Sequence, residues 1–346
     1  MLDIAFIRTL FIKPLDYAIQ KHYGLSFQQL DIPELLIRES MSLIPFKDYL
    51  FWLDRIEELT NDPSYMITLA DQMTFSSMGG LGEWYLSCPD LPLALRRINY
   101  GLSCLQSGAS YHSELSGKII KWTYENPYSK GKGSRHDHLR VAVLFTQTLR
   151  DYMGEDFSPL KIEINAQEIR SEKIAEFFQC PIRWGAPKTQ VWLPMSILGA
   201  SNNQPPKSTK PMLVSNLQLD DFLNMPQPAD TAKLMFELIN YSRYYQYPNL
   251  EFIAEQLSLS KQQLQRRLHH FGWTFTDTTN YVLCNIAIKY MQQALPIEQI
   301  AANLSYKNVQ SFTKAFQRNR GITPLQYQQQ LLEKQQNFTC LKTKKG

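Results

Sequence analysis

Residues 249–272, NLEFIAEQLSLSKQQLQRRLHHFG, join two apolar periodic runs through a short polar turn, which is typical of a helix-turn-helix. Asn249 precedes the first run and favours a helix start there. Ser260 opens the second helix, and with Gln263 it predicts a capping box, in which each side chain bonds a backbone N–H that the helix start leaves unpaired. Gly272 predicts the end of this helix, which we expect over residues 261–271.

Residues 297–330, IEQIAANLSYKNVQSFTKAFQRNRGITPLQYQQQ, repeat the same plan. Residues 305–307 form the second turn, Asn308 caps the following helix, and that helix should end near Gly321. A closing helix then begins at residues 323–326, where Thr, Pro and Gln supply the cap, the first turn and the box partner. One long periodic segment, residues 275–295, predicts a connecting helix shared by both units.

Winding the second helix of each unit at 100° per residue separates an apolar face from a polar one. Six side chains form the apolar faces, and we expect them to lie inward: Leu264, Leu268, Phe271, Val309, Phe312 and Phe316. The polar faces contain no acidic residue. Arg, Lys, Gln and Ser match base-edge acceptors and phosphates in a DNA major groove, whereas a merely solvated polar face is the ordinary alternative. The candidate DNA-binding residues are Lys261, Gln262, Gln263, Gln265, Arg266, Gln310, Ser311, Lys314, Gln317 and Arg318.

The second unit resembles the C-terminal signature of AraC-type (AraC/XylS family) transcriptional activators, I-A…L-x-[FY]…S-F-x-[RK]-x-F-[KQ]…G-x-[ST]-P-x-x-[YF]-R. The first unit is similar to that family's first helix-turn-helix, so the resemblance implies an all-α domain with two such units. Ser258 and Ser305 stand in the turns where the family usually has Gly, which predicts a loss of stability if φ is positive there. Gln328 replaces the Arg after the closing Tyr, which could remove a phosphate contact.

The charge of the chain is divided unevenly between its two parts. From residue 230 onward there are 14 Lys and Arg against 7 Asp and Glu, a net charge of +7, while the first 229 residues have 22 against 25, or −3. The total of +4 therefore hides a basic C-terminal module, as expected of a domain that binds DNA phosphates. A length of 346 residues with 44% hydrophobic content allows two domains with real cores.

The five cysteines are odd in number and have no C-x-x-C or Cys/His ligand spacing, which predicts reduced and mostly buried thiols. Asp3, Arg8, Lys13 and Asp16 interrupt the apolar N-terminus, and no cleavage site of small residues follows, so a signal peptide is not expected. No stretch approaches the ~20 apolar residues of a membrane span. We expect a cytoplasmic protein with no membrane association.

The N-terminal region begins with helices and continues into a sheet. The expected helices cover residues 2–23, 45–59, 63–73, 83–87, 91–105, 136–153 and 172–178. The expected strands are 110–115 and 118–125, forming a hairpin, then 160–165, 182–184 and 189–193. Helices alternating with an antiparallel or mixed sheet predict an α+β domain. The glycines of Gly79-Gly80-Leu81-Gly82 neither follow a clear strand nor precede a P-loop Lys, so they do not predict a phosphate site.

This region resembles the arabinose-binding-like effector and dimerisation domain of one AraC-type branch, whose members sense a metabolite or fatty acid. Three segments carry the resemblance: LGEWYLSCPDLPLALRRINYGL, YHSELSGKIIKWTYE and FFQCPIRWGAPKTQVWLP. Residues 199–211, GASNNQPPKSTKP, have the composition of a linker, and residues 213–223 predict a small docking helix. We therefore expect an effector domain at 1–198, a linker and docking segment at 199–228, a DNA-binding domain at 229–332 and a basic tail at 333–346.

Catalytic and metal-binding motifs are lacking in the sequence. His136 and His138 could suggest a metal, but residues two apart in a helix point to different faces, and zinc needs three or four converging ligands. No G-x-S-x-G or H-E-x-x-H motif occurs, and Cys284 lies among apolar helix residues where burial makes a thiol inert. An enzyme, such as a DNA-repair protein with an AraC-like module, is the less favoured alternative.

The sequence thus predicts a bacterial-type transcription regulator, an activator that needs no cofactor. Its expected partners are double-stranded DNA, RNA polymerase, a small-molecule effector and a second copy of the chain. The effector has an open alternative, since residues 1–198 could serve dimerisation alone. A ligand-independent dimeric or architectural DNA-binding protein is the alternative for the whole chain.

Overall fold

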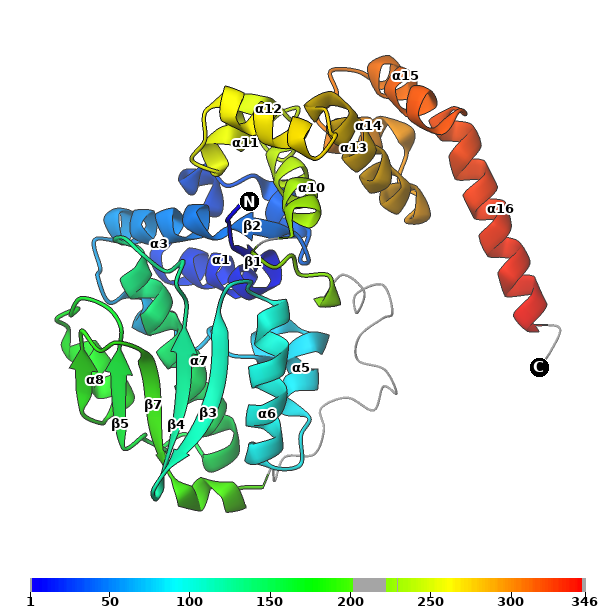
Figure 1. Ribbon diagram of the computed structural model, residues 1–346. Helices are drawn as coiled ribbons and strands as arrows, with labels where there is room; N and C mark the ends of the chain where they lie inside the picture. Colours follow the sequence, from blue (N-terminus) through cyan, green and yellow to red (C-terminus); the bar gives the residue numbers. More distant parts are fainter. Residues whose placement is uncertain (1, 202–221, 229, 344–346) are drawn as a thin grey trace. The chain divides into compact units, whose positions relative to one another are not determined.

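The computed structural model describes residues 2–201, 222–228 and 230–343, and their side chains as far as residue 333. The chain divides into an N-terminal unit, Ile4–Pro228, and a C-terminal unit of residues 229–346 with the first three residues of the chain. The first unit combines helices with sheets and the second is helical throughout its described part (Figure 1). The predicted combination of an α+β domain and an all-α domain is confirmed. Most of the predicted linker, and most of the docking helix at 213–223, lies outside the described residues.

The N-terminal unit contains seven strands and eight α-helices among its described residues. The strands are β1 (Phe6–Arg8), β2 (Leu43–Pro45), β3 (Ser110–Ser116), β4 (Ile119–Glu125), β5 (Lys161–Ile164), β6 (Ile182–Trp184) and β7 (Thr189–Pro194). The helices are α1 (Thr9–Tyr23), α2 (Glu34–Arg38), α3 (Phe46–Thr60), α4 (Tyr65–Thr68), α5 (Gly80–Leu86), α6 (Leu91–Gly101), α7 (Ser134–Met153) and α8 (Glu172–Phe178).

The main sheet of this unit has five strands in the order β3-β4-β7-β5-β6. Strands β5 and β6 are parallel and all other neighbours are antiparallel, so the sheet is mixed. The predicted hairpin joins β3 to β4, where Ser116 pairs with Ile119 across a turn that contains Gly117 at φ 62°. A second, two-stranded sheet pairs β1 with β2.

Helix α7 lies between the five-stranded sheet and helices α3 and α4, which it contacts on its other side. Trp122 of β4 stacks on Phe145 of α7, with ring centroids 3.7 Å apart and planes within 5°. The predicted inward-facing residues Leu139, Val143, Leu144 and Leu149 are buried, but so are 14 of the 20 residues of the helix. Because both sides of α7 are covered, its polar side chains must find partners inside the protein.

Two predicted helices in this unit were wrong in extent. Residues 2–5 are not helical and Phe6–Arg8 form strand β1, because this apolar run pairs with β2 instead of continuing α1. Of residues 63–73 only Tyr65–Thr68 are helical. The side chain of Asp62 accepts hydrogen bonds from both the backbone N–H and the hydroxyl of Ser64, which holds a turn ahead of this short helix, and the chain then buries Leu69 and Met73 through turns.

The C-terminal unit consists of seven helices among its described residues. They are α10 (Thr231–Ser242), α11 (Leu250–Gln256), α12 (Lys261–His270), α13 (Phe275–Gln292), α14 (Ile297–Asn303), α15 (Val309–Arg320) and α16 (Pro324–Thr343). Helix α13 contacts α10, α14, α15 and α16, and its buried side chains include Val282, Leu283, Ala287 and Met291. It is therefore the centre of this unit, in keeping with the predicted connecting helix.

Candidate nucleic-acid interface

The first helix-turn-helix is formed by α11 and α12, which contact each other across a short turn. The side-chain oxygen of Asn249 accepts from the N–H of Phe252 at 2.9 Å and so caps α11. The predicted capping box of α12 is present, since the N–H of Gln263 donates to Ser260 Oγ at 3.2 Å and the N–H of Ser260 donates to Gln263 Oε1 at 2.8 Å. These bonds set the start of α12 locally, which explains why the sequence predicted it well.

The second helix-turn-helix is formed by α14 and α15, and its second helix also begins at a side-chain cap. Asn308 Oδ1 accepts from the N–H of Ser311 at 2.8 Å, and Gly321 ends α15 in the left-handed conformation at φ 81°. Thr323 and Gln326 make the box that opens α16, with backbone-to-side-chain distances of 3.1 and 3.3 Å. Both units thus have independent local determinants of their second helix.

The turns of the two units contain Ser258 at φ 53° and Ser305 at φ 59°, which confirms the positive φ that a glycine would tolerate better. The two serines differ in one respect. Ser305 Oγ donates to the backbone oxygen of Arg243 at 2.6 Å, whereas Ser258 is exposed. Arg243 is itself buried and donates to the backbone oxygen of Asn303 at 3.0 Å. These contacts link the end of α10 to the second helix-turn-helix.

The polar face of α12 is exposed at every predicted position. Leu264 and Leu268 are buried beneath it, but the prediction for Phe271 was wrong, because this ring is 42% exposed. Phe271 follows the last residue of α12, where the backbone turns away, and its ring lies 5.4 Å from that of Trp273. The five candidate residues with exposed side chains are Lys261, Gln262, Gln263, Gln265 and Arg266.

Two of these five side chains also have partners within the protein. The Lys261 ammonium lies 3.2 Å from a carboxylate oxygen of Glu251 in α11, and the Gln263 carbonyl oxygen is used in the capping box. For the other three candidate residues, Gln262, Gln265 and Arg266, the described part of the chain shows no side-chain hydrogen bond or ion pair. Arg266 is therefore the cationic group on α12 that is best placed to act on an outside partner.

The polar face of α15 is equally exposed. Phe312 and Phe316 are buried as predicted, while Val309 at the first position of the helix is only half-buried. The five candidate residues with exposed side chains are Gln310, Ser311, Lys314, Gln317 and Arg318. Arg320 differs from them because its guanidinium donates to Asn285 Oδ1 at 2.6 Å and so joins α15 to α13.

Gln328, the residue after the closing Tyr, is buried and bonded within the protein. Its side chain is 9% exposed, and its amide nitrogen donates to the backbone oxygen of Leu295 at 2.8 Å, just beyond the end of α13. The side chain at this position therefore satisfies a carbonyl group between α13 and α14 rather than facing outward. The loss of a phosphate contact through the change from Arg to Gln stays a prediction.

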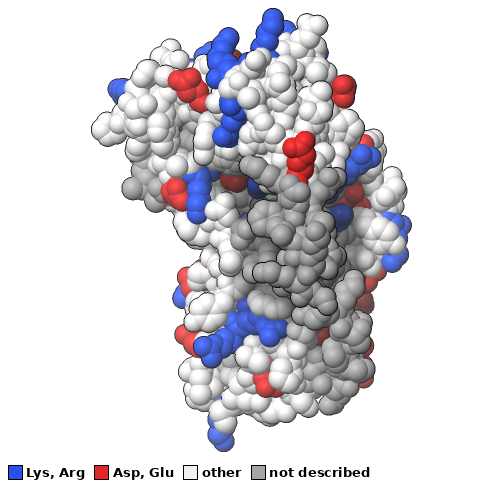
Figure 2. Space-filling model, turned by 90° about the vertical axis from the view of Figure 1, so that its right-hand side faces the viewer, with Lys and Arg blue, Asp and Glu red and all other residues white. Residues whose placement is uncertain are grey.

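Basic side chains occur on the surface in several separate groups, with acidic residues between them, on the face drawn in Figure 2. Helices α12 and α15 differ from this mixed surface, because neither contains an Asp or Glu. Helix termini add to this, since the first N–H groups of a helix attract anions such as phosphate. An acid-free polar face on each of two capped helices is an arrangement suited to a polyanion.

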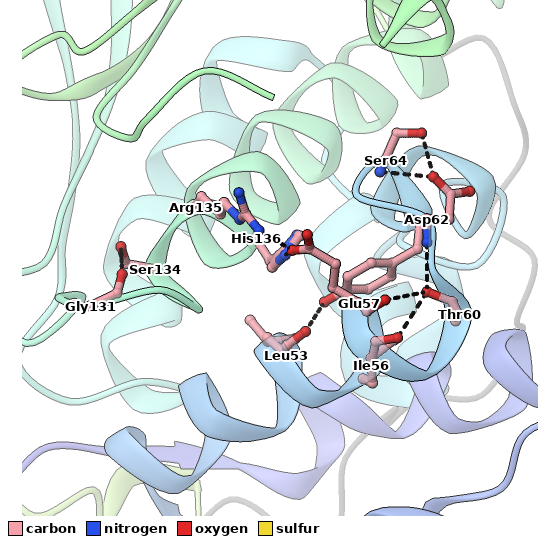
Figure 3. A network of polar contacts seen from close by, with 11 residues as sticks. Leu53, Ile56, Glu57, Thr60, Asp62, Ser64, Gly131, Ser134, Arg135 and His136 are labelled. Atoms are coloured by element: carbon pink, nitrogen blue, oxygen red, sulfur yellow. Dashed lines mark hydrogen bonds and ion pairs between the residues drawn. The ribbon is translucent and has the colours of Figure 1, made fainter. Parts of the chain in front are cut away.

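In the described part of the chain, no cluster of three His, Cys, Asp or Glu residues that could hold a metal ion occurs. His136 and His138 point in opposite directions. His136 Nε2 meets Glu57 of α3 (Figure 3), and His138 Nδ1 lies 2.8 Å from Thr189 Oγ1 of β7. Burial lowers the pKa of both imidazoles. Burial also raises the pKa of the Cys284 thiol to about 11, so it is protonated at neutral pH.

None of the described helices is both long enough and apolar enough to span a lipid bilayer.

Two family models match the chain. The model of the arabinose-binding domain of AraC transcription regulators, N-terminal, matches residues 26–202, just over half of the chain, and a helix-turn-helix domain model matches residues 253–330. The ornithine utilization regulator of Pseudomonas aeruginosa is 30% identical over 84 residues, which cover 24% of this chain and 25% of that protein. An uncharacterized HTH-type transcriptional regulator of Mycobacterium tuberculosis is 22% identical over 147 residues, 42% of each chain.

The chain therefore spans a quarter to less than half of the length of these curated relatives. Among solved structures, the transcriptional regulator CdpR of Pseudomonas aeruginosa is 16% identical with a TM-score of 0.42, covering 92% of this chain and 98% of that one.

Proposed function

Because this chain belongs to the AraC family of transcription regulators, with a helix-turn-helix DNA-binding domain and an arabinose-binding-like N-terminal domain, we propose that it is a sequence-specific activator. It binds double-stranded DNA through α12 and α15 and recruits RNA polymerase at the promoters that it occupies. Its N-terminal unit senses a small molecule, dimerises, or does both. It acts in the cytoplasm of a bacterial cell, where the chromosome is accessible.

The single observation that carries this proposal is the pair of exposed faces on α12 and α15. Each face lies on the capped second helix of a helix-turn-helix. The two faces are rich in Arg, Lys, Gln and Ser, and neither has an acidic residue. One such face is common on protein surfaces, but two on helices tied to the same central helix fit successive major grooves of one DNA duplex.

We assign different tasks to the residues of these faces. Arg266 and Gln310 contact base edges, because a guanidinium forks onto guanine and a carboxamide onto adenine. Arg318 lies near the C-terminal end of α15 and contacts phosphate, as does Lys314. Lys261 and Gln263 mainly hold the start of α12, since their side chains already bond to Glu251 and Ser260.

The test uses the full chain and an operator identified by mapping its binding sites across the genome. Arg266→Ala should weaken operator binding by about 1–3 kcal/mol and relax the preferred base at one position. Arg266→Lys keeps the charge but loses the fork, so it should retain non-specific binding and lose the base preference. Equal losses on operator and random DNA for Arg266→Ala would refute its assignment.

The alternative is a dimeric or architectural DNA-binding protein that needs no ligand. Such a protein would bind many sequences with similar affinity, and its occupancy would not respond to metabolites. Mapping binding sites with and without candidate effectors separates this alternative from a regulator that senses a small molecule, because only that regulator gains or loses sites. The base preference at Arg266 separates it from a sequence-specific regulator that only dimerises.

A further inference from the structure

A pocket of about 360 Å³ opens on the N-terminal unit between α1, the segment after α2 and the turn before α5. This volume lies at the lower end of the ~300–1,000 Å³ that is usual for small-molecule sites. Five apolar side chains line the pocket: Leu10, Met41, Met78, Leu81 and Phe222. Among the described residues of its lining, the polar side chains are Lys13, Ser40 and Ser77, and none is acidic.

The walls of this pocket are held by contacts that do not depend on a ligand. Arg8 is buried, and its guanidinium donates to the backbone oxygens of Met41 at 2.7 Å and Phe222 at 3.3 Å. Arg8 therefore fastens two lining residues that are far apart in the sequence. A cavity whose lining is already fixed loses less entropy on binding than one that must form.

Gly79 and the first two residues of α5, Gly80 and Leu81, form another wall. Gly79 has φ 63° and ψ −145°, a conformation that side chains rarely adopt. At Gly82 a Cβ atom would lie 1.6 Å from the backbone oxygen of Phe75, so only glycine allows this close approach. Gly79 and Gly82, which were not expected to form a phosphate site, thus shape the start of α5 beside the pocket.

Lys13 is the only charged residue among the described residues that line the pocket. Lys13 is exposed on α1, and its ammonium lies 3.4 Å from Ser40 Oγ at the rim. Asp16 lies one turn further along α1. Burial raises the pKa of its carboxyl group, and the positive charge of Lys13 opposes this rise. A cation at the rim of an apolar cavity is complementary to an anionic head joined to an apolar body.

A second hollow, beside the contacts drawn in Figure 3, is less suited to a ligand. It has a volume of about 660 Å³ and is lined by acidic and basic residues together, including Asp54, Glu58 and Lys132. Glu57 in this lining is already bonded to Arg135 and His136 of α7, whose side chains point toward it. Two charged residues of this lining, Glu57 and Arg135, therefore already have partners within the protein.

We propose that the pocket at Lys13 is the effector site of the N-terminal unit and that its ligand is a small organic acid with an apolar body. The carboxylate lies at the rim against Lys13 and Ser40, and the apolar body lies against Met41, Met78 and Phe222. This inference rests on the proposed function, because it names the ligand class of the sensing domain.

The position of Phe222 connects the pocket with the DNA-binding domain along the chain. Phe222 is buried in the N-terminal unit and belongs to the stretch that leads through residue 228 to α10. A ligand that packs on Phe222 stabilises one placement of this stretch. It can alter DNA binding only to the extent that it binds that placement better than others.

The experiment measures octanoate binding to the full chain by titration calorimetry, with 1-octanol as the uncharged probe of equal length. Lys13→Met should weaken octanoate binding about tenfold, the typical effect of losing a hydrogen bond to a charged group, and should not change octanol binding. Lys21→Met, on the same helix but outside the pocket, is the matched control.

A second pair of variants fills the cavity. Ser77→Trp places a large ring in the pocket from an exposed position and should abolish octanoate binding. Ser76→Trp is the control, because Ser76 is also exposed and also contacts Thr74 but does not line the pocket. Unfolding temperatures of all four variants check that each is folded.

The site is supported if Lys13→Met and Ser77→Trp impair octanoate binding and both control variants retain it. Absence of octanoate binding to the wild-type chain, or equal binding by all variants, overturns it. DNA binding is measured on the same samples without octanoate. A chain that binds its operator but not octanoate refutes this inference alone, whereas a chain that binds no DNA refutes the proposed function.

Discussion

Replacement of Ser258 by Gly should stabilise the first helix-turn-helix. Ser258 adopts φ 53° and is exposed, so its side chain contributes little to offset the conformation. The left-handed conformation costs a residue with a Cβ roughly 1–2 kcal/mol. Glycine removes this cost but has more freedom in the unfolded chain, which offsets about 0.5–1 kcal/mol. We therefore expect Ser258→Gly to add about 0.5–1 kcal/mol to the local stability of α11 and α12.

Ser305→Gly is the matched comparison, because the backbone at Ser305 has nearly the same φ, 59°. Its hydroxyl, however, donates to the backbone oxygen of Arg243 at 2.6 Å in a partly buried setting. Losing such a bond costs about 1 kcal/mol, which cancels the gain from the backbone. We expect Ser305→Gly to leave the stability of α14 and α15 unchanged or slightly reduced.

Native-state hydrogen exchange of the full chain measures both variants, since it reports stability segment by segment. Amides of α11 and α12 should exchange about two- to fivefold more slowly in Ser258→Gly, the factor that corresponds to 0.5–1 kcal/mol. Amides of α14 and α15 should not slow in Ser305→Gly. No slowing in Ser258→Gly would show that the turn conformation of Ser258 costs no stability. Equal slowing in both variants would show that the hydrogen bond of the Ser305 hydroxyl does not offset the gain.

Three further outcomes follow from particular contacts. Arg318→Ala should weaken binding to operator and random DNA alike and reduce the salt dependence of binding by about one phosphate contact; a change in base preference would contradict its assignment. Cys284, with its pKa raised by burial to about 11, should react with a thiol reagent at pH 8 only after unfolding, which labelling with and without denaturant measures. Asp62 is partly desolvated, which opposes ionisation, but bonds from Ser64, Lys173 and Tyr23 lower its pKa from 3.8 to about 2. Its folded-state pKa is depressed, so its contribution is present above pH 4 and is lost as the pH falls toward 2. Asp62→Asn should lower the unfolding temperature at pH 7, and the deficit should shrink over that acidic range; a constant deficit would mean that ionisation does not matter.

The double helix-turn-helix was predictable because its determinants are local. Asn249, Ser260, Asn308 and Thr323 each bond to a backbone N–H within three residues of themselves, and such bonds can be inferred from spacing alone. The exposure of the ten candidate DNA-binding residues likewise follows from helical periodicity. Their contacts with DNA remain a prediction.

Features that depend on distant partners could not be predicted in this way. The burial of α7 on both sides requires knowledge that the sheet and α3 meet the same helix. The strand at residues 6–8 forms only because residues 43–45 lie beside it. The bond from Gln328 to Leu295 depends on the packing of α16 against α13, and the family motif gave no indication of it. The pocket at Lys13 likewise joins segments from four parts of the sequence.

The most direct test of the central claim measures the affinity of the full chain for an operator with half a helical turn of DNA inserted between the two sub-sites. If α12 and α15, tied by α13, enter successive major grooves about 34 Å apart, one protomer should protect close to two turns of DNA. Half a turn of extra DNA moves one sub-site to the opposite face of the duplex, so affinity should fall toward that for a single sub-site. Unchanged affinity would contradict the account, because it would mean that only one of the two units binds DNA.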